Sequence, residues 1–210
     1  MIEVYAFATP NSVKVLIALE EMGLPYELKP VNVRKGEQKN DLFLALNPNG
    51  KVPVLVDDGF VLTESAAILV HLAEKTGKLL SQDNVSRARV FEELFFHASG
   101  VSPAFGNAGF FKRSSPEPQP IAEARFTSEA ERLLGLLDAK LASQPFVAGD
   151  AFTIADIAHF GWIWRLQFAG LTLEGCPNLS RWFETVGARP SVQQALLRAE
   201  GLVESAGSAA

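Results

Sequence analysis

The chain has 210 residues and a mass of 22.8 kDa, which is enough for one large domain or two small ones. Hydrophobic residues make up 48% and charged residues 20%, a composition that is typical of a globular protein and excludes collagen-like repeats, coiled coil and intrinsic disorder. The net charge is −5 and no Lys/Arg-rich run is present, so the sequence does not predict nucleic-acid binding.

The first expected elements are a strand at residues 2–7, a helix at 13–22 and a second strand at 26–33. Gly23 ends the helix. The loop that precedes the helix, residues 8–12, has turn and cap residues. This order predicts a right-handed βαβ unit whose two strands run parallel.

A weak helix at 39–46 leads to a third strand at 51–56. Asp58-Gly59 then marks a tight turn into an antiparallel partner at 60–62. Pro53 lacks a backbone N–H donor, so we expect it at the entrance of the third strand, with a cis peptide bond before it.

Cap chemistry at 63–65 precedes a helix at 66–75, which Gly77 closes. Ser65 is expected to cap this helix through its hydroxyl. Beyond residue 80 strand patterns end, and the remaining segments are helical, including an amphipathic helix at 121–141 and an apolar one at 154–168.

The single cysteine, Cys176, excludes a disulfide scaffold, a multi-cysteine metal site and a CxxC redox centre. His71, His97 and His159 have no metal-ligand partners at usable spacing, so we expect no metal. The sequence has no export signal and no apolar run of about 18 residues, which predicts a cytoplasmic protein that does not cross a membrane.

The loop before the first helix places backbone N–H groups and a positive dipole end beside Thr9 and Asn11, an arrangement that suits an anion or a thiolate. These residues could also serve only the turn and the helix start. Glu64-Ser65 opens a second helix in the same way, and its alternative is likewise a helix cap alone.

The order of the motifs resembles that of the cytosolic glutathione transferases. These motifs are Thr9-Pro10-Asn11 before the first helix, Asn47-Pro48-Asn49-Gly50-Lys51-Val52-Pro53 before the third strand, Glu64-Ser65, and Thr153-Ile154-Ala155-Asp156 in the helical half. The last motif is a capping box and has a structural role.

Within that family the chain is most similar to the bacterial nu class, through Thr9-Pro10-Asn11, Lys35-Gly36-Glu37-Gln38, the stretch from 47 to 53, and the segments 72–77 and 124–126. The resemblance implies an N-terminal thioredoxin-like α/β domain (βαβαββα) at residues 1–80 and an all-helical domain at 87–200. It also implies a homodimer.

The same resemblance implies glutathione as co-substrate and the reduction of small disulfides, with Thr9 and Asn11 as the catalytic residues. Its implied glutathione-binding residues are Gln38, Lys51, Val52, Pro53, Glu64, Ser65 and Arg125. Phe110 and Phe111 are candidates for a hydrophobic pocket, and Phe126 departs from the usual Tyr. Conjugation of glutathione to hydrophobic electrophiles and glutathione binding without catalysis are the alternatives.

Overall fold

The computed structural model describes residues 1–207, with side chains to residue 203. The chain forms two compact units. The first contains Met1–Lys78 and the chain from Ala188 onward, and the second contains Leu79–Gly187. Each unit has its own buried apolar core, so each is described by itself.

The first unit is a four-stranded sheet with helices, in the strand order β2-β1-β3-β4. Strands β1 and β2 are parallel, as the βαβ pattern predicts, and the other two pairs are antiparallel. The elements are β1 (Ile2–Ala6), α1 (Pro10–Met22), β2 (Tyr26–Pro30), η1 (Glu37–Lys39), α2 (Asp41–Leu46), β3 (Val54–Asp57), β4 (Phe60–Thr63), α3 (Ser65–Thr76) and α9 (Pro190–Gly207).

Helix α1 is the most buried helix of the first unit. Thr9 caps its start, and Gly23 closes it in the left-handed conformation, with φ of 70°, which glycine adopts at little cost. Nine of its thirteen residues are buried, because α1 packs against both α3 and α9. On its first turns, the polar residues Ser12 and Lys14 are therefore buried, whereas Asn11 is half-buried.

Helix α9 groups with the first unit, although the predicted domain limits assign residues 190–200 to the helical domain. The guanidinium of Arg189 donates from Nε and Nη2 to the two carboxylate oxygens of Glu21, at 2.5 and 2.8 Å. Arg198 Nε lies 2.7 Å from Glu20 Oε1. These ion pairs join α1 to α9 and to the residue directly before it. The paired residues lie 168 or more positions apart in the sequence, and local sequence patterns do not encode such pairs.

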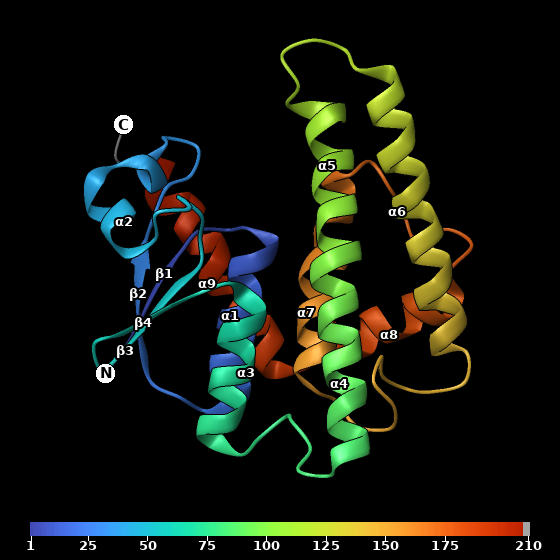
Figure 1. Cartoon of the computed structure of the whole chain (residues 1–210), viewed down its shortest axis with the longest axis horizontal. Helices are drawn as coiled ribbons and strands as arrows, with labels where there is room; N and C mark the ends of the chain where they lie inside the picture. The colour runs from blue at the N-terminus through green and yellow to red at the C-terminus, as the bar shows by residue number, and fades with distance from the viewer. Residues whose placement is uncertain (208–210) are drawn as a thin grey trace. The chain divides into compact units, whose positions relative to one another are not determined.

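The second unit is helical, as predicted from the loss of strand patterns after residue 80. Figure 1 shows α4, η2 and α5 stacked end to end as one column, with α6 beside α5. The middle segment η2 is a π-helix. The elements are α4 (Asn84–Phe96), η2 (His97–Val101), α5 (Ser102–Arg113), α6 (Pro120–Leu141), α7 (Ile154–Trp164), η3 (Leu166–Phe168) and α8 (Pro177–Gly187).

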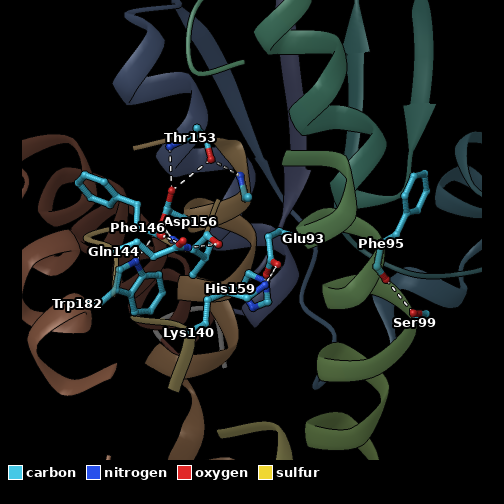
Figure 2. A network of polar contacts seen from close by, with 12 residues as sticks. Glu93, Phe95, Ser99, Lys140, Gln144, Phe146, Thr153, Asp156, His159 and Trp182 are labelled. Atoms are coloured by element: carbon cyan, nitrogen blue, oxygen red, sulfur yellow. Dashed lines mark hydrogen bonds and ion pairs between the residues drawn. The ribbon is translucent and has the colours of Figure 1, made fainter. Parts of the chain in front are cut away.

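The predicted capping box at the start of α7 is present and extends into a larger network (Figure 2). Asp156 Oδ2 accepts from the Thr153 N–H at 2.9 Å, while Oδ1 accepts from the Val147 N–H and from the Trp182 indole N–H, both at 2.9 Å. Burial raises the pKa of the Asp156 carboxyl. One buried side chain thus fixes the start of α7, the loop before it and α8.

A second polar cluster joins α4, α6 and α7 (Figure 2). Glu93 is buried and forms an ion pair with Lys140, and His159 Nε2 lies 3.4 Å from Glu93 Oε2. The His97 ring meets the His159 ring edge-on, with 4.9 Å between centroids. Both histidines therefore occupy core positions in the helical unit.

Two negative observations apply to residues 1–207. No helix in this part of the chain has the length and apolar character needed to span a bilayer. The same residues hold no group of three or more His, Cys, Asp or Glu side chains arranged to bind a metal ion.

Replacing Asp156 by Ala should lower the free energy of unfolding by about 3 to 5 kcal/mol, because two backbone N–H groups and an indole N–H lose their acceptor in a dry environment. Asp156→Asn keeps one acceptor oxygen and should lose less. Urea denaturation measures both, with Asp150→Ala, in an exposed loop, as the control. A loss below about 1 kcal/mol for Asp156→Ala would contradict the role of this network.

Candidate functional site

Thr9 and Asn11 lie at the N-terminus of α1, where the sequence places them. The Thr9 hydroxyl oxygen accepts from the Ser12 N–H at 3.2 Å, so Thr9 is a helix cap. Its hydroxyl and that of Ser12 are 3.0 Å apart, a distance at which either can donate to the other. When Ser12 donates, the Thr9 proton is available to a ligand, so the cap role and a ligand role are compatible.

The Ser12 side chain contacts the loop that precedes α1. It is fully buried, and its hydroxyl oxygen accepts from the Phe7 N–H at 3.4 Å. Phe7 also accepts, through its carbonyl, from the Thr9 N–H at 2.7 Å. Hydrogen bonds around Thr9 therefore join the residue after β1 to the start of α1.

Lys14 is a residue that sequence reasoning missed. Its side chain is 1% exposed, and its Nζ donates to Asn11 Oδ1 at 2.7 Å. Burial lowers the pKa of the Lys14 amine to about 7, and the negative charge of Glu64 acts in the opposite direction. The pattern that could have revealed it is a single lysine inside the apolar run of residues 13–19.

The turn before β3 is fixed by Asn47. Its side chain donates from Nδ2 to the Lys51 carbonyl at 2.7 Å and accepts at Oδ1 from the Asn49 N–H at 3.0 Å. The peptide bond between Val52 and Pro53 is cis, and Pro53 directly precedes β3, both as predicted. The turn thus presents Lys51 and Val52 in a defined conformation outside the ladder of the sheet.

Gln38 and Lys51 are brought close by a glycine. Gly50 has φ of +63°, and a Cβ built there would lie 3.3 Å from the Gln38 carbonyl oxygen. The segment that carries Gln38 therefore packs directly on the turn that carries Lys51. Gln38 Oε1 is buried and has no hydrogen-bond partner among residues 1–203, whereas Lys51 is exposed.

Glu64 and Ser65 lie where β4 passes into α3. Glu64 is the cap residue, has φ of 67° and makes no side-chain cap hydrogen bond, and Ser65 is the first residue of the helix. The expectation that the Ser65 hydroxyl caps α3 is wrong, because the helix begins one residue before the predicted start. The Glu64 carboxylate is exposed, and the first N–H groups of α3 follow it.

The remaining candidate residues belong to the second unit. Phe110 and Phe111, at the end of α5, meet edge-on with 5.2 Å between ring centroids. Phe111 stacks on Phe126 of α6, with centroids 5.6 Å apart and ring planes 4° from parallel. Arg125 is exposed on α6. Phe126, which departs from the usual Tyr, therefore packs in an aromatic cluster.

Tyr5 and Cys176 each carry a group that could ionise to a nucleophile, and both lie in environments that disfavour ionisation. Tyr5 is inside β1, its hydroxyl donates to Glu3 Oε2 at 3.2 Å, and burial raises the pKa of the phenol. Cys176 belongs to the second unit, and burial raises the pKa of its thiol. Neither environment favours an ionised nucleophile.

Comparison with known proteins gives two matches to protein-family models. Residues 8–75 match the glutathione S-transferase N-terminal domain, and residues 104–190 match the glutathione S-transferase C-terminal domain. The first match covers Thr9, the turn at 47–50 and Glu64. The second covers α6 with Arg125.

Two relatives from Escherichia coli (strain K12) are named disulfide-bond oxidoreductases. YfcG is 38% identical over 209 residues, which are 95% of this chain and 96% of that protein. YghU is 36% identical over 211 residues, which are 92% of this chain and 73% of that protein.

Solved structures of glutathione transferases are also similar to this chain. A glutathione transferase family member from Pseudomonas fluorescens pf-5, with two glutathione molecules bound, has a TM-score of 0.87 and 37% identity over 93% of this chain and 92% of that one. A glutathione transferase from Pseudomonas putida, with one glutathione disulfide bound per subunit, has a TM-score of 0.87 and 35% identity over 93% and 90% of the two chains.

Asn47→Ala should lower the free energy of unfolding by about 1 to 3 kcal/mol, because the Asn49 N–H and the Lys51 carbonyl lose their partner. It should also loosen the turn that precedes Pro53. Thermal and urea denaturation measure the loss, and Asn49→Ala, an exposed asparagine in the same turn, is the matched control. Equal stability of the two variants would show that Asn47 does not fix this turn.

Proposed function

Because the chain belongs to the glutathione S-transferase family, we propose that it binds glutathione in its first unit and uses the glutathione thiol to reduce small disulfides. The observation that carries this proposal is the polar start of α1. Thr9 and Asn11 lie there together, and the sequence has no cysteine in that loop to act as a nucleophile of its own. The thiol would therefore be supplied by glutathione.

Thr9 and Asn11 are the proposed catalytic residues. A glutathione thiol resembles that of free cysteine, with a pKa of about 8.5, and it becomes a good nucleophile when donors and a positive dipole end favour its thiolate. The Thr9 hydroxyl and the Asn11 side-chain amide supply donors of this kind, and the helix dipole adds a partial positive charge.

The rest of glutathione would lie along the loops of the first unit. The Val52 backbone before Pro53 would pair with the cysteinyl amide as an added strand does. Glu64 would hold the γ-glutamyl ammonium, and the Ser65 N–H its carboxylate. Gln38 and Lys51, which the packing at Gly50 keeps near each other, would hold the glycyl end.

The proposed reaction is two successive thiol–disulfide exchanges. The glutathione thiolate attacks one sulfur of the disulfide, a new S–S bond forms to glutathione, and the other half leaves as a thiolate that takes up a proton. A second glutathione thiolate then attacks the mixed disulfide and releases glutathione disulfide and the second thiol. Two electrons pass from two glutathione molecules to the substrate.

The finer parts of the proposal concern the second unit and the assembly. Arg125 would contribute to the glutathione site across a homodimer, and Phe110 and Phe111 would line a pocket for the apolar part of the second substrate. A reducing compartment such as the cytoplasm would supply glutathione at the required concentration. Sedimentation equilibrium tests the dimer, and a monomer at micromolar concentration would contradict this part.

Reduction of hydroxyethyl disulfide by glutathione should be well above the uncatalysed rate. Thr9→Ala and Asn11→Ala should each reduce kcat about 10- to 100-fold, because each removes a donor to a charged sulfur. A coupled glutathione reductase assay measures the turnover. Asn84→Ala, at an exposed helix start in the second unit, should retain the full rate.

Three outcomes separate the proposed activity from its alternatives. Wild-type turnover no faster than the uncatalysed rate would contradict disulfide reduction. Turnover of aromatic or halogenated electrophiles in its place would identify a conjugating transferase, with the Phe110 and Phe111 cluster as its pocket. Calorimetric binding of glutathione without turnover in either assay would indicate a glutathione-binding protein.

A further inference from the structure

A lysine lies buried beside one of the two proposed catalytic residues. Lys14 is 1% exposed, and its Nζ lies 2.7 Å from Asn11 Oδ1. The two residues are three positions apart on α1, so their side chains are neighbours on one face of the helix. Neither the family-model matches nor the helix pattern gives this lysine a role.

The chemistry of the contact fixes the direction of the Asn11 amide. An ammonium group has three donors and no acceptor, so only the oxygen end of the amide can face it favourably. A flipped amide would place two donors against each other. With Oδ1 held by Lys14, both N–H donors of Nδ2 remain for a different acceptor, which in the proposed reaction is the glutathione sulfur.

A positive charge on Lys14 would also favour the glutathione thiolate. A buried ammonium loses hydration, which disfavours its charged form and lowers the pKa of Lys14 to about 7. Glu64 opposes this effect, since its negative charge favours the ammonium. A thiolate bound at the start of α1 would be a further anion nearby, and the stabilisation is mutual, because each charge favours the ionised form of the other.

We propose that Lys14 is a positioning residue, which holds the Asn11 amide with its N–H donors toward the glutathione sulfur and thereby favours the thiolate. This inference rests on the proposed function and goes beyond it by assigning a role to a residue that does not contact the sulfur. The simplest alternative is that Lys14 only fills its place between α1 and its neighbours.

A double-mutant cycle separates the two roles. The variants are Lys14→Met, which keeps most of the length of the side chain without its charge, Asn11→Ala, and both together. For each variant we would measure kcat and KM with hydroxyethyl disulfide, and the pKa of bound glutathione from the ultraviolet absorbance of its thiolate. Calorimetry with S-methylglutathione, which has no ionisable thiol, gives the affinity for the rest of the ligand.

Lys14→Met alone should reduce kcat about tenfold and raise the pKa of the bound thiol by about one unit, the scale of one charge-assisted hydrogen bond. The affinity for S-methylglutathione should stay within about twofold. In the Asn11→Ala background, Lys14→Met should reduce kcat by a clearly smaller factor than in the wild type, because the amide is absent and only the direct effect of the charge remains.

Equal fold-losses in both backgrounds, or a loss of S-methylglutathione affinity that accounts for the lower turnover, would overturn the positioning role. Lys14→Arg keeps a positive charge and N–H donors, so it should retain most of the kcat of the wild type. Lys14→Arg also tests the positioning role if Lys14→Met does not fold. A folded Lys14→Arg protein that binds S-methylglutathione normally but loses about tenfold in kcat would likewise contradict the inference.

The wild-type protein distinguishes this inference from the proposed function. If the wild type neither binds glutathione nor turns over a disulfide, the proposed function itself fails. If the wild type lowers the pKa of the bound thiol and Lys14→Met leaves it unchanged, only the role of Lys14 fails.

Discussion

The burial of the first two turns of α1 is the constraint on which the candidate site depends. Thr9, Ser12 and Lys14 lie within this short segment, and each side chain has a partner: the Ser12 N–H, the Phe7 N–H and the Asn11 amide respectively. Loops around a rigid helix end can present polar groups with little loss of conformational freedom on binding. Helices α3 and α9 both pack against α1, and this packing buries most of the helix.

Most of the fold follows from local patterns, because its causes are local. Gly23 ends α1, Asp58-Gly59 turns β3 into β4, and Thr153 with Asp156 starts α7, and each of these acts within a few residues. The polar residues at the start of α1 and around Pro53 were visible for the same reason. Their roles as glutathione ligands are predictions.

The features that the sequence did not indicate arise from contacts between distant segments. Lys14 looks like an exposed residue until α3 and α9 cover its helix, and α9 groups with the first unit because it packs against α1, next to the pair of Glu21 with Arg189. Asp156 was predicted as part of a capping box, but its bonds to Val147 and Trp182 extend that role to two further segments. Sequence periodicity carries no information on such partners.

The return of α9 to the first unit makes that unit discontinuous along the chain. During synthesis the sheet and α1 leave the ribosome long before their last covering helix, whereas the second unit is a single continuous segment. Folding of the first unit is therefore completed only when the second has been made. A fragment cut near residue 80 would also expose the face of α1 that α9 covers and leave Glu21 without Arg189, so the first unit is best studied in the full chain.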